Sequence, residues 1–231
     1  MSFIRAELKA KAKADLKGNM GTAIGAMVVT SAIAGAAVSV AIVPYIITMV
    51  SSAALIRTSD AAAVATMLAG MAIYIALLLA CIFLVAYPLS MGTYCFYLRG
   101  ARTGKHEFKD VFGGFKFYGK SIGLAFMVGL FTYLWSLLFY VPGFIKAYSY
   151  SMSYWELAND PSISVMEAIR RSKTMTNGYK GKLFVLDLSF MGWMLLAACT
   201  CSIGSFFLTP YMNATYANAY LKLKELNDSK V

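Results

Sequence analysis

The chain has 231 residues, of which 59% are apolar and only 14% are charged, and its formal net charge is +10. Soluble domains carry roughly 25% charged residues, so this composition excludes an ordinary soluble globular protein. The basic excess does not indicate nucleic-acid binding, because the charges are divided among short segments between apolar runs. The sequence therefore predicts a single integral membrane domain over residues 1–231.

The positions of the 21 Lys and Arg residues predict the orientation in the membrane. All of them except Arg57 and Lys146 fall into four clusters, and basic residues prefer the cytoplasmic side. We therefore expect an all-α polytopic fold with six transmembrane helices, paired as three hairpins, and with both termini in the cytoplasm. The clusters lie at residues 5–17, 99–120, 170–182 and 222–230.

Residues 1–19 are predicted to form an amphipathic helix on the inner leaflet. Its apolar residues recur every four positions, from Ile4 to Leu16, and lysines lie between them. Such a helix binds a bilayer through its apolar face and anionic lipid through its charges. The lipid bilayer and its anionic lipids are the partners that we expect, and a homo-oligomer or a membrane-protein partner is a further possibility. The predicted lipid-surface residues are Lys9, Lys11, Lys13, Lys17, Arg170 and Arg171.

The first hairpin is predicted over residues 20–98. Its outgoing helix runs from Gly21 to Ile56 and is expected to kink or break at Pro44, because proline lacks the N–H and clashes with the preceding turn. Residues 57–60 form the outer turn. The second helix, Ala61 to Leu98, returns through Pro88.

The second hairpin, within residues 99–158, begins with a short amphipathic piece, Glu107 to Phe117. Residues 119–141 cross outward, and Pro142-Gly143 is the expected turn. Residues 144–158 must then return inward, because the basic residues after position 170 belong in the cytoplasm.

The third hairpin is predicted within residues 159–231. Ser164 and Glu167 have the spacing of a capping box that begins a cytoplasmic amphipathic helix, and Asn177-Gly178 is typical of a helix end. Residues 183–200 then cross outward, residues 201–204 turn, and residues 205–223 return.

Three prolines suggest an internal repeat and a polar cleft. Pro88, Pro142 and Pro210 each precede a tyrosine by six residues, and interrupted helices at matching positions are typical of transporter sites. If the repeat builds a cleft, the three tyrosines share one axis and Asp187 bonds to a hydroxyl, an Asn or a Lys. Alternatively, the tyrosines form an interfacial aromatic belt and Asp187 faces headgroups or a nearby lysine. The candidate cleft residues are Tyr94, Tyr148, Ser151, Asp187, Asn213, Thr215 and Tyr216.

No pattern indicates an enzyme, a cofactor or a metal site. His106 is the only histidine and lies in a charged loop, where we expect it to be solvated. Gly21/Gly25 and Gly119/Gly123 form G-x-x-x-G motifs, which favour close helix packing. We expect that packing to occur within the monomer.

Several segments of the second half carry a family resemblance. They are Tyr148–Met152, Asn159–Ser164, Glu167–Ile169, Met175–Gly178, Leu183–Trp193 and Thr209–Tyr211. Together they resemble the bacterial membrane family called domain of unknown function 975. The resemblance covers most of the chain, is strongest from Pro142 onward and is weakest in the first hairpin. It implies a multi-pass protein of the bacterial cytoplasmic membrane, and it carries over no activity.

The sequence leaves two functions open. The basic amphipathic segments favour a membrane scaffold or envelope-maintenance factor that binds anionic lipid. Asp187 and the interrupted helices favour a transporter-like or accessory permease with a cytoplasm-facing polar cleft.

Overall fold

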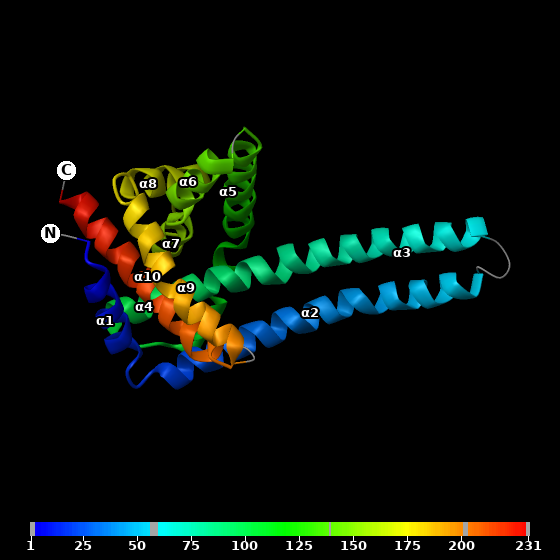
Figure 1. The fold of residues 1–231 in the computed structure, drawn as a ribbon, viewed down its shortest axis with the longest axis horizontal. Coiled ribbons are helices and arrows are strands. Elements are labelled where there is room, and N and C mark those ends of the chain that lie inside the picture. The colour runs from blue at the N-terminus through cyan, green and yellow to red at the C-terminus, as the bar shows by residue number, and fades with distance from the viewer. Residues whose placement is uncertain (1–2, 56–59, 139, 201–202, 230–231) are drawn as a thin grey trace. The chain divides into compact units, whose positions relative to one another are not determined.

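The computed structural model describes residues 3–55, 60–138, 140–200 and 203–229, and these residues form helices without a strand (Figure 1). The predicted all-α fold is thereby confirmed. In this part of the chain, four helical segments are long and apolar enough to cross a membrane. The six-span count and the threefold hairpin arrangement stay predictions. The four segments are Met20–Ala53, Ala61–Thr103, Phe108–Leu137 and Lys180–Cys199.

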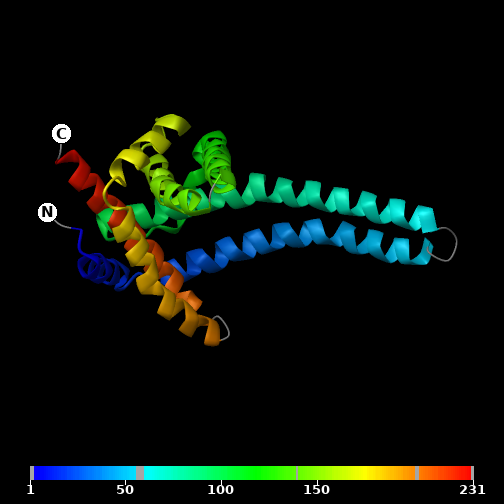
Figure 2. The same ribbon diagram turned by 45° about the horizontal axis from the view of Figure 1, so that its top comes forward.

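The chain divides into two compact units. Unit 1 consists of Met1–Met27 and Pro88–Val231, and unit 2 consists of Val28–Tyr87. Unit 2 holds most of α2 (Met20–Leu55) together with α3 (Asp60–Cys81), which run side by side in both views (Figures 1 and 2).

The two helices of unit 2 are joined through small and aromatic residues. The Cys81 thiol donates to the carbonyl oxygen of Ala37 at 3.2 Å, and the rings of Tyr45 and Tyr74 lie 5.1 Å apart. Gly70 faces Thr48 so closely that a Cβ there would overlap the threonine side chain. Small residues let the two backbones approach, as they do in membrane helix pairs generally.

The prolines interrupt the helices less than predicted. Pro44 lies inside a continuous α2 and Pro210 inside a continuous α10 (Ser205–Asp228). Only at Pro88 does the hydrogen-bond pattern change: a π-helical turn, η1 (Ile82–Ala86), precedes α4 (Tyr87–Thr103). A π turn accommodates the carbonyl that proline leaves without its α-helical donor.

The predicted turn at Pro142-Gly143 is wrong. Helix α5 (Tyr118–Leu138) is followed by α6, which already begins at Tyr140, so both residues belong to the first turn of α6. Proline is tolerated in a first helical turn because no N–H is required of it there. The glycine lies against Ser136 of α5. The other two predicted turns, at residues 57–60 and 201–204, fall largely outside the described residues.

The predicted return helix over residues 144–158 is also different in the structure. Helix α6 ends at Tyr150, and α7 (Ser153–Asn159) follows after a short break. Three of the polar side chains in this segment, Ser149, Ser153 and Glu156, are buried. The two short helices place these groups in the interior of unit 1, where the Ser149 hydroxyl and Glu156 Oε1 form hydrogen bonds.

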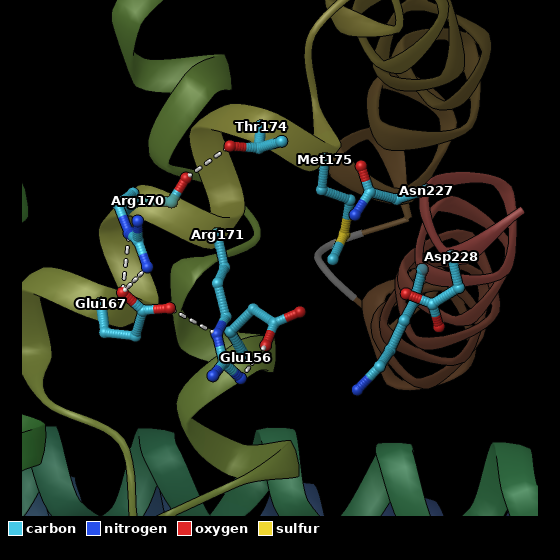
Figure 3. A pocket seen from close by; sticks show the side chains of 9 residues that line it. Glu156, Glu167, Arg170, Arg171, Thr174, Met175, Asn227 and Asp228 are labelled. Atoms are coloured by element: carbon cyan, nitrogen blue, oxygen red, sulfur yellow. Dashed lines mark hydrogen bonds and ion pairs between the residues drawn. The ribbon is translucent and has the colours of Figure 1, made fainter. Parts of the chain in front are cut away.

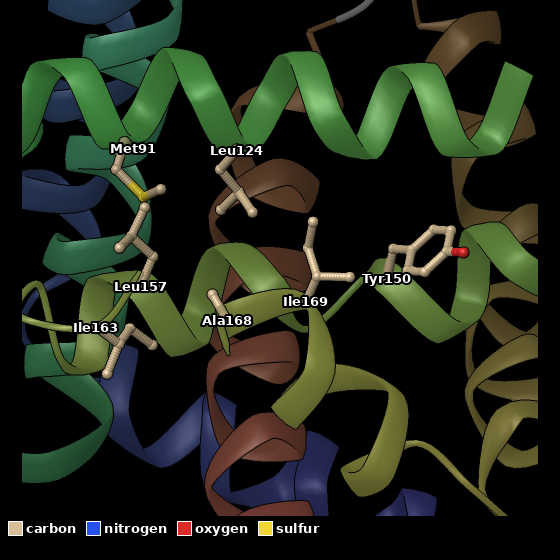
Figure 4. Packing of buried hydrophobic residues seen from close by; sticks show 7 residues of the cluster. All are labelled: Met91, Leu124, Tyr150, Leu157, Ile163, Ala168 and Ile169. Atoms are coloured by element: carbon tan, nitrogen blue, oxygen red, sulfur yellow. The ribbon is translucent and has the colours of Figure 1, made fainter. Parts of the chain in front are cut away.

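The core of unit 1 forms where α5 covers α7 and α8 (Val165–Met175). Figure 4 shows the buried side chains of this core, which come from α4, α5, α6, α7, α8 and the loop before α8. Half of the predicted capping box is present: Ser164 Oγ accepts from the Glu167 N–H at 3.2 Å, whereas the Glu167 carboxylate accepts from Arg170 and Arg171. Gly178, with φ +81°, follows the helix end as predicted. The core residues are Met91, Leu124, Tyr150, Leu157, Ile163, Ala168 and Ile169.

The N-terminal helix packs on protein. Helix α1 (Arg5–Leu16) lies against α10, and its apolar residues Leu8, Ala12 and Leu16 are buried. Asn218 of α10 donates to Asp15 Oδ2 at 2.7 Å. The apolar face that we expected on the inner leaflet is therefore covered by α10, a partner 200 residues away that periodicity does not reveal.

The short piece η2 (Phe108–Phe117) is a 3₁₀ helix close to its predicted bounds. Phe108, Phe112 and Phe115 are exposed and form a row of neighbouring rings. Such a row suits the interfacial region of a bilayer.

Candidate functional site

The structure brings Asp187 together with two of the predicted tyrosines. Asp187 lies on α9 (Lys180–Cys199), Tyr148 on α6 and Tyr216 on α10. The Tyr148 hydroxyl donates to Asp187 Oδ2 at 2.6 Å, and the Tyr216 hydroxyl donates to Oδ1. The expectation that Asp187 bonds to a hydroxyl is confirmed. The half-buried carboxylate thus ties three helices together, and a charged oxygen strengthens each of these bonds.

The other predicted cleft residues lie elsewhere. Tyr94 stacks on Tyr154, with ring centres 5.4 Å apart, and meets Trp155 edge-on at 4.8 Å. A shared axis of the three tyrosines is therefore wrong, because α4 turns Tyr94 toward α7. Ser151 and Thr215 donate to backbone carbonyls within their own segments, and Asn213 bonds to the Tyr97 side chain.

The predicted lipid-surface residues divide into free and engaged groups. Lys11, Lys13 and Lys17 are exposed on α1. Lys9 is half-buried: its Nζ lies 4.1 Å from the centre of the Phe190 ring and donates to the Ser189 carbonyl at 3.4 Å. Burial, and secondarily Arg5, lowers the pKa of Lys9.

Arg170 and Arg171 are held by one carboxylate. Glu167 accepts from Arg170 Nε at 2.7 Å and from Arg171 Nε at 2.8 Å. The two guanidinium groups lower the pKa of Glu167 to about 2, so its charge persists at neutral pH. The charges of these arginines are thereby partly neutralised.

An apolar groove of about 500 Å³ lies between α1, α9 and α10. Lys13 is the one charged residue among the described residues that line it. The groove is open rather than enclosed, because three of its lining residues, Trp193, Leu196 and Phe207, are each more than half exposed. The remaining lining residues are Met20, Ala197, Thr200, Gly204, Leu208 and Tyr211.

A polar pocket of about 390 Å³ lies between α7, α8 and α10 (Figure 3). Glu156 at its wall is only 2% exposed. Its Oε1 accepts from the Tyr220 hydroxyl at 3.2 Å, whereas Oε2 has no hydrogen bond from a described residue. Burial raises the pKa of Glu156, although Lys224, Tyr220 and Arg171 oppose the shift. The lining residues are Glu156, Glu167, Arg170, Arg171, Thr174, Met175, Lys224, Asn227 and Asp228.

The expectation that His106 is solvated is wrong. His106 is 8% exposed, and it lies beside the rings of Phe96 and Tyr97. A Cβ on Gly100 would overlap its imidazole, so the glycine makes room for the ring. Burial lowers the pKa of His106, and the side chain is therefore neutral at pH 7.

The glycine motifs also differ from expectation. A Cβ at Gly21, Gly25 or Gly119 would meet no described atom within 4 Å, whereas one at Gly123 would touch Val165 at 3.4 Å. Most of these positions are therefore open within the described chain. The packing predicted for the first motif is absent there.

Sequence reasoning missed the Glu156 pocket as a site. Its members come from three segments, and neither charge type has a recognisable spacing. One signal was present: Glu156 is the only acid within the apolar run from residue 144 to 158. An acid in such a run needs a partner, which Tyr220 supplies in part.

Comparison with known proteins gives one family. Residues 138–227 match the family described as "Protein of unknown function (DUF975)". Neither a curated protein nor a solved structure matches the chain. The family resemblance expected from the sequence is therefore confirmed, but over residues 138–227 rather than over most of the chain. This part carries the Asp187 cluster and nearly all of the Glu156 pocket.

Proposed function

We propose that this protein is a membrane scaffold or envelope-maintenance factor that binds anionic phospholipid at the groove between α1, α9 and α10. The observation that carries the proposal is the position of Lys13 at an otherwise apolar groove. An acyl chain fits the apolar walls, and a phosphate fits the ammonium group of Lys13. One phospholipid supplies both features.

The surroundings of the groove support this assignment. Lys11 and Lys17 add exposed charge on the same helix as Lys13, and each lysine near a membrane surface contributes about 1 kcal/mol toward anionic lipid. The neighbouring face of α9 exposes Leu188 and Leu195, 47% and 65% respectively. Basic and apolar surfaces side by side are suited to the boundary between headgroups and acyl chains.

The same geometry bears on topology. Lys9 lies against the middle of α9, at Ser189 and Phe190, and Lys13 lies near its far end, beside Thr200. In a hairpin that crosses the bilayer upright, α1 would carry these lysines into the hydrocarbon, which is costly. We propose that α1 and the α9–α10 hairpin lie together at the cytoplasmic interface, with both termini on that side, and that the chain crosses the membrane fewer than six times.

Lipid binding is tested with the full chain in neutral detergent. Titration with phosphatidylglycerol should stabilise the protein against heat, and Lys13→Gln should weaken the apparent affinity about fivefold, which corresponds to about 1 kcal/mol. Lys105→Gln, an exposed lysine in another loop, is the matched control and should have no effect. Equal stabilisation by phosphatidylcholine, or an equal loss in both variants, would contradict the proposal.

The topology is tested with the exposed native Cys199. In a variant with Cys81, Cys95 and Cys201 replaced by alanine, a membrane-impermeant maleimide added outside intact cells should leave Cys199 unlabelled. An added Arg57→Cys substitution should introduce labelling, since residue 57 is expected on the far side. Labelling of Cys199 from outside would instead restore the crossing hairpin and the six-span arrangement.

A permease is the second candidate, favoured by the partners of Asp187. The carboxylate bonds to two hydroxyls rather than to Lys182, which leaves it suited to exchange a proton or a small cation. Proteoliposomes with an internal pH dye should then acidify faster than empty vesicles under an inward proton gradient, and Asp187→Asn should abolish the difference. Equal rates with wild type, variant and empty vesicles would remove this candidate.

A further inference from the structure

The Glu156 pocket carries an inference that is independent of the lipid groove. Its starting point is the buried oxygen Glu156 Oε2, which has no hydrogen-bond donor among the described residues. The nearest positive group is Arg171 Nη1, at 4.0 Å, beyond hydrogen-bond distance. Glu156 lines the pocket, and a buried carboxylate oxygen without a donor favours a ligand that brings one.

The opposite charge is also present in the pocket. Arg171 is fixed through its Nε by Glu167, and its Nη1 lies 3.8 Å from Asp160 Oδ2 as well. Its Nη groups therefore retain donors for another acceptor. Lys224 on α10 forms no hydrogen bond or ion pair with a described residue, yet it lines the same pocket.

The balance of charges selects the class of ligand. Among the described lining residues, Glu156, Glu167 and Asp228 oppose Arg170, Arg171 and Lys224. A simple anion would approach the carboxylates, and a simple cation would approach the guanidinium groups, so each meets repulsion. A ligand with one charge of each sign satisfies both sets.

We propose that the pocket binds a small zwitterion whose primary ammonium donates to Glu156 Oε2 and whose carboxylate or phosphate accepts from Arg171 and Lys224. The pocket volume, about 390 Å³, lies near the lower end of ligand sites, which run from about 300 to 1,000 Å³. The site therefore suits an amino acid or a headgroup rather than a larger molecule.

Two sources offer this chemistry: a free solute, such as an α-amino acid, and an aminoethyl phosphate headgroup at the membrane surface. Both place an ammonium a few bonds from an anion. The pocket is built from different residues than the lipid groove, so the two proposals stand or fall separately.

The test uses the full chain, reconstituted in phosphatidylcholine nanodiscs. Calorimetric titration with glycine and with O-phosphoethanolamine should give saturable binding of at least one, with Kd of about 1 mM or lower. Ethanolamine, which lacks the anion, and N-acetylglycine, which lacks the amine, should bind at least about tenfold more weakly. A parallel arm adds phosphatidylethanolamine to the nanodiscs and measures the shift in thermal unfolding.

The variants locate the binding at the pocket. Glu156→Gln keeps the shape and removes the charge, and Lys224→Met removes the ammonium from the other wall; each should weaken binding about tenfold or more. Glu225→Gln, an exposed neighbour paired with Lys222, is the matched control. If Glu156→Gln fails to fold, Lys224→Met decides.

Each outcome decides the proposal. Binding of a soluble probe without a response to phosphatidylethanolamine supports a free solute, and a response to phosphatidylethanolamine supports the headgroup. The proposal is overturned if neither arm responds, if ethanolamine binds as well as glycine and O-phosphoethanolamine, or if Lys224→Met and Glu225→Gln behave alike.

Discussion

The two units are held together by different means. In unit 2, hydroxyls bond within their own helix, as Ser39 does to Gly35 and Ser51 to Ile47, and its described residues form no ion pair. In unit 1, polar groups join separate helices: Ser172 donates to the Ser149 carbonyl at 2.8 Å, and Asp187 links three helices. Unit 2 thus depends on close backbone packing, and unit 1 depends on a filled core and specific polar contacts.

The largest expected effect is a cavity in unit 1. Leu157 is fully buried in the core beside Leu124 and Ile169, so Leu157→Ala should lower the free energy of unfolding by about 2–5 kcal/mol. Tryptophan fluorescence in mixed micelles measures this loss, because all three tryptophans belong to unit 1 and report its unfolding. Leu195→Ala, at a side chain 65% exposed, should cost less than about 0.5 kcal/mol. Equal losses would mean that the core does not determine stability.

The helix pair of unit 2 should instead be destabilised by a larger side chain at its closest contact. Gly70→Leu forces a side chain against Thr48, and overpacking of this kind costs about 1–3 kcal/mol. The rate at which a maleimide modifies Cys81, which bonds across the pair to Ala37, should rise accordingly. Gly25→Leu, where no described atom lies within 4 Å, is the control and should leave that rate unchanged. An unchanged rate in Gly70→Leu would refute the close pairing.

Helix caps should matter in unit 1, where helices are short. Helix α8 has only 11 residues, and Ser164→Ala removes the acceptor of its N-cap. The expected loss is about 1 kcal/mol, measured by the same tryptophan fluorescence. Thr174→Ala, which removes only a bond to a carbonyl within α8, serves as the comparison. If both substitutions cost the same, the cap contributes nothing specific.

The smallest expected effect is a pH dependence of the unfolding free energy that is confined to unit 1. Burial lowers the pKa of His106 below its usual 6.5, so the unfolded chain takes up the proton first. The contribution of neutral, buried His106 to the free energy of unfolding is therefore complete above pH 6.5 and is lost as the pH falls toward the lowered pKa. His106→Phe should remove this part of the slope of unfolding free energy against pH, while Cys81 labelling in unit 2 follows the same pH course in both proteins. A slope that the substitution leaves unchanged would rule out His106 as its source.

Local sequence patterns predicted the elements that local interactions determine. The apolar helices follow from composition, and the start of α8 follows from the Ser164 and Glu167 pair. Asp187 was recognised because a carboxylate in an apolar helix needs a donor, and the structure supplies two hydroxyls. These features need only residues close in the chain or the general cost of burying a charge.

The features that were missed depend on distant contacts. The division of residues 144–158 into α6 and α7 follows from burial of Glu156 beside Tyr220, 64 positions away. His106 is buried because Gly100 leaves room for its ring. Periodicity also showed that α1 has an apolar face, but it did not show whether lipid or protein covers that face.

The packing of α1 on α10 has a consequence for biosynthesis. The ribosome makes α1 before α10, and the bond from Asn218 to Asp15 joins residues 203 positions apart. At about 5–20 residues per second, α1 waits some tens of seconds for its partner. During that interval Leu8, Ala12 and Leu16 lack the partner that buries them in the folded chain. Synthesis therefore includes a stage at which the apolar face of α1 is present and the helix that covers it is not.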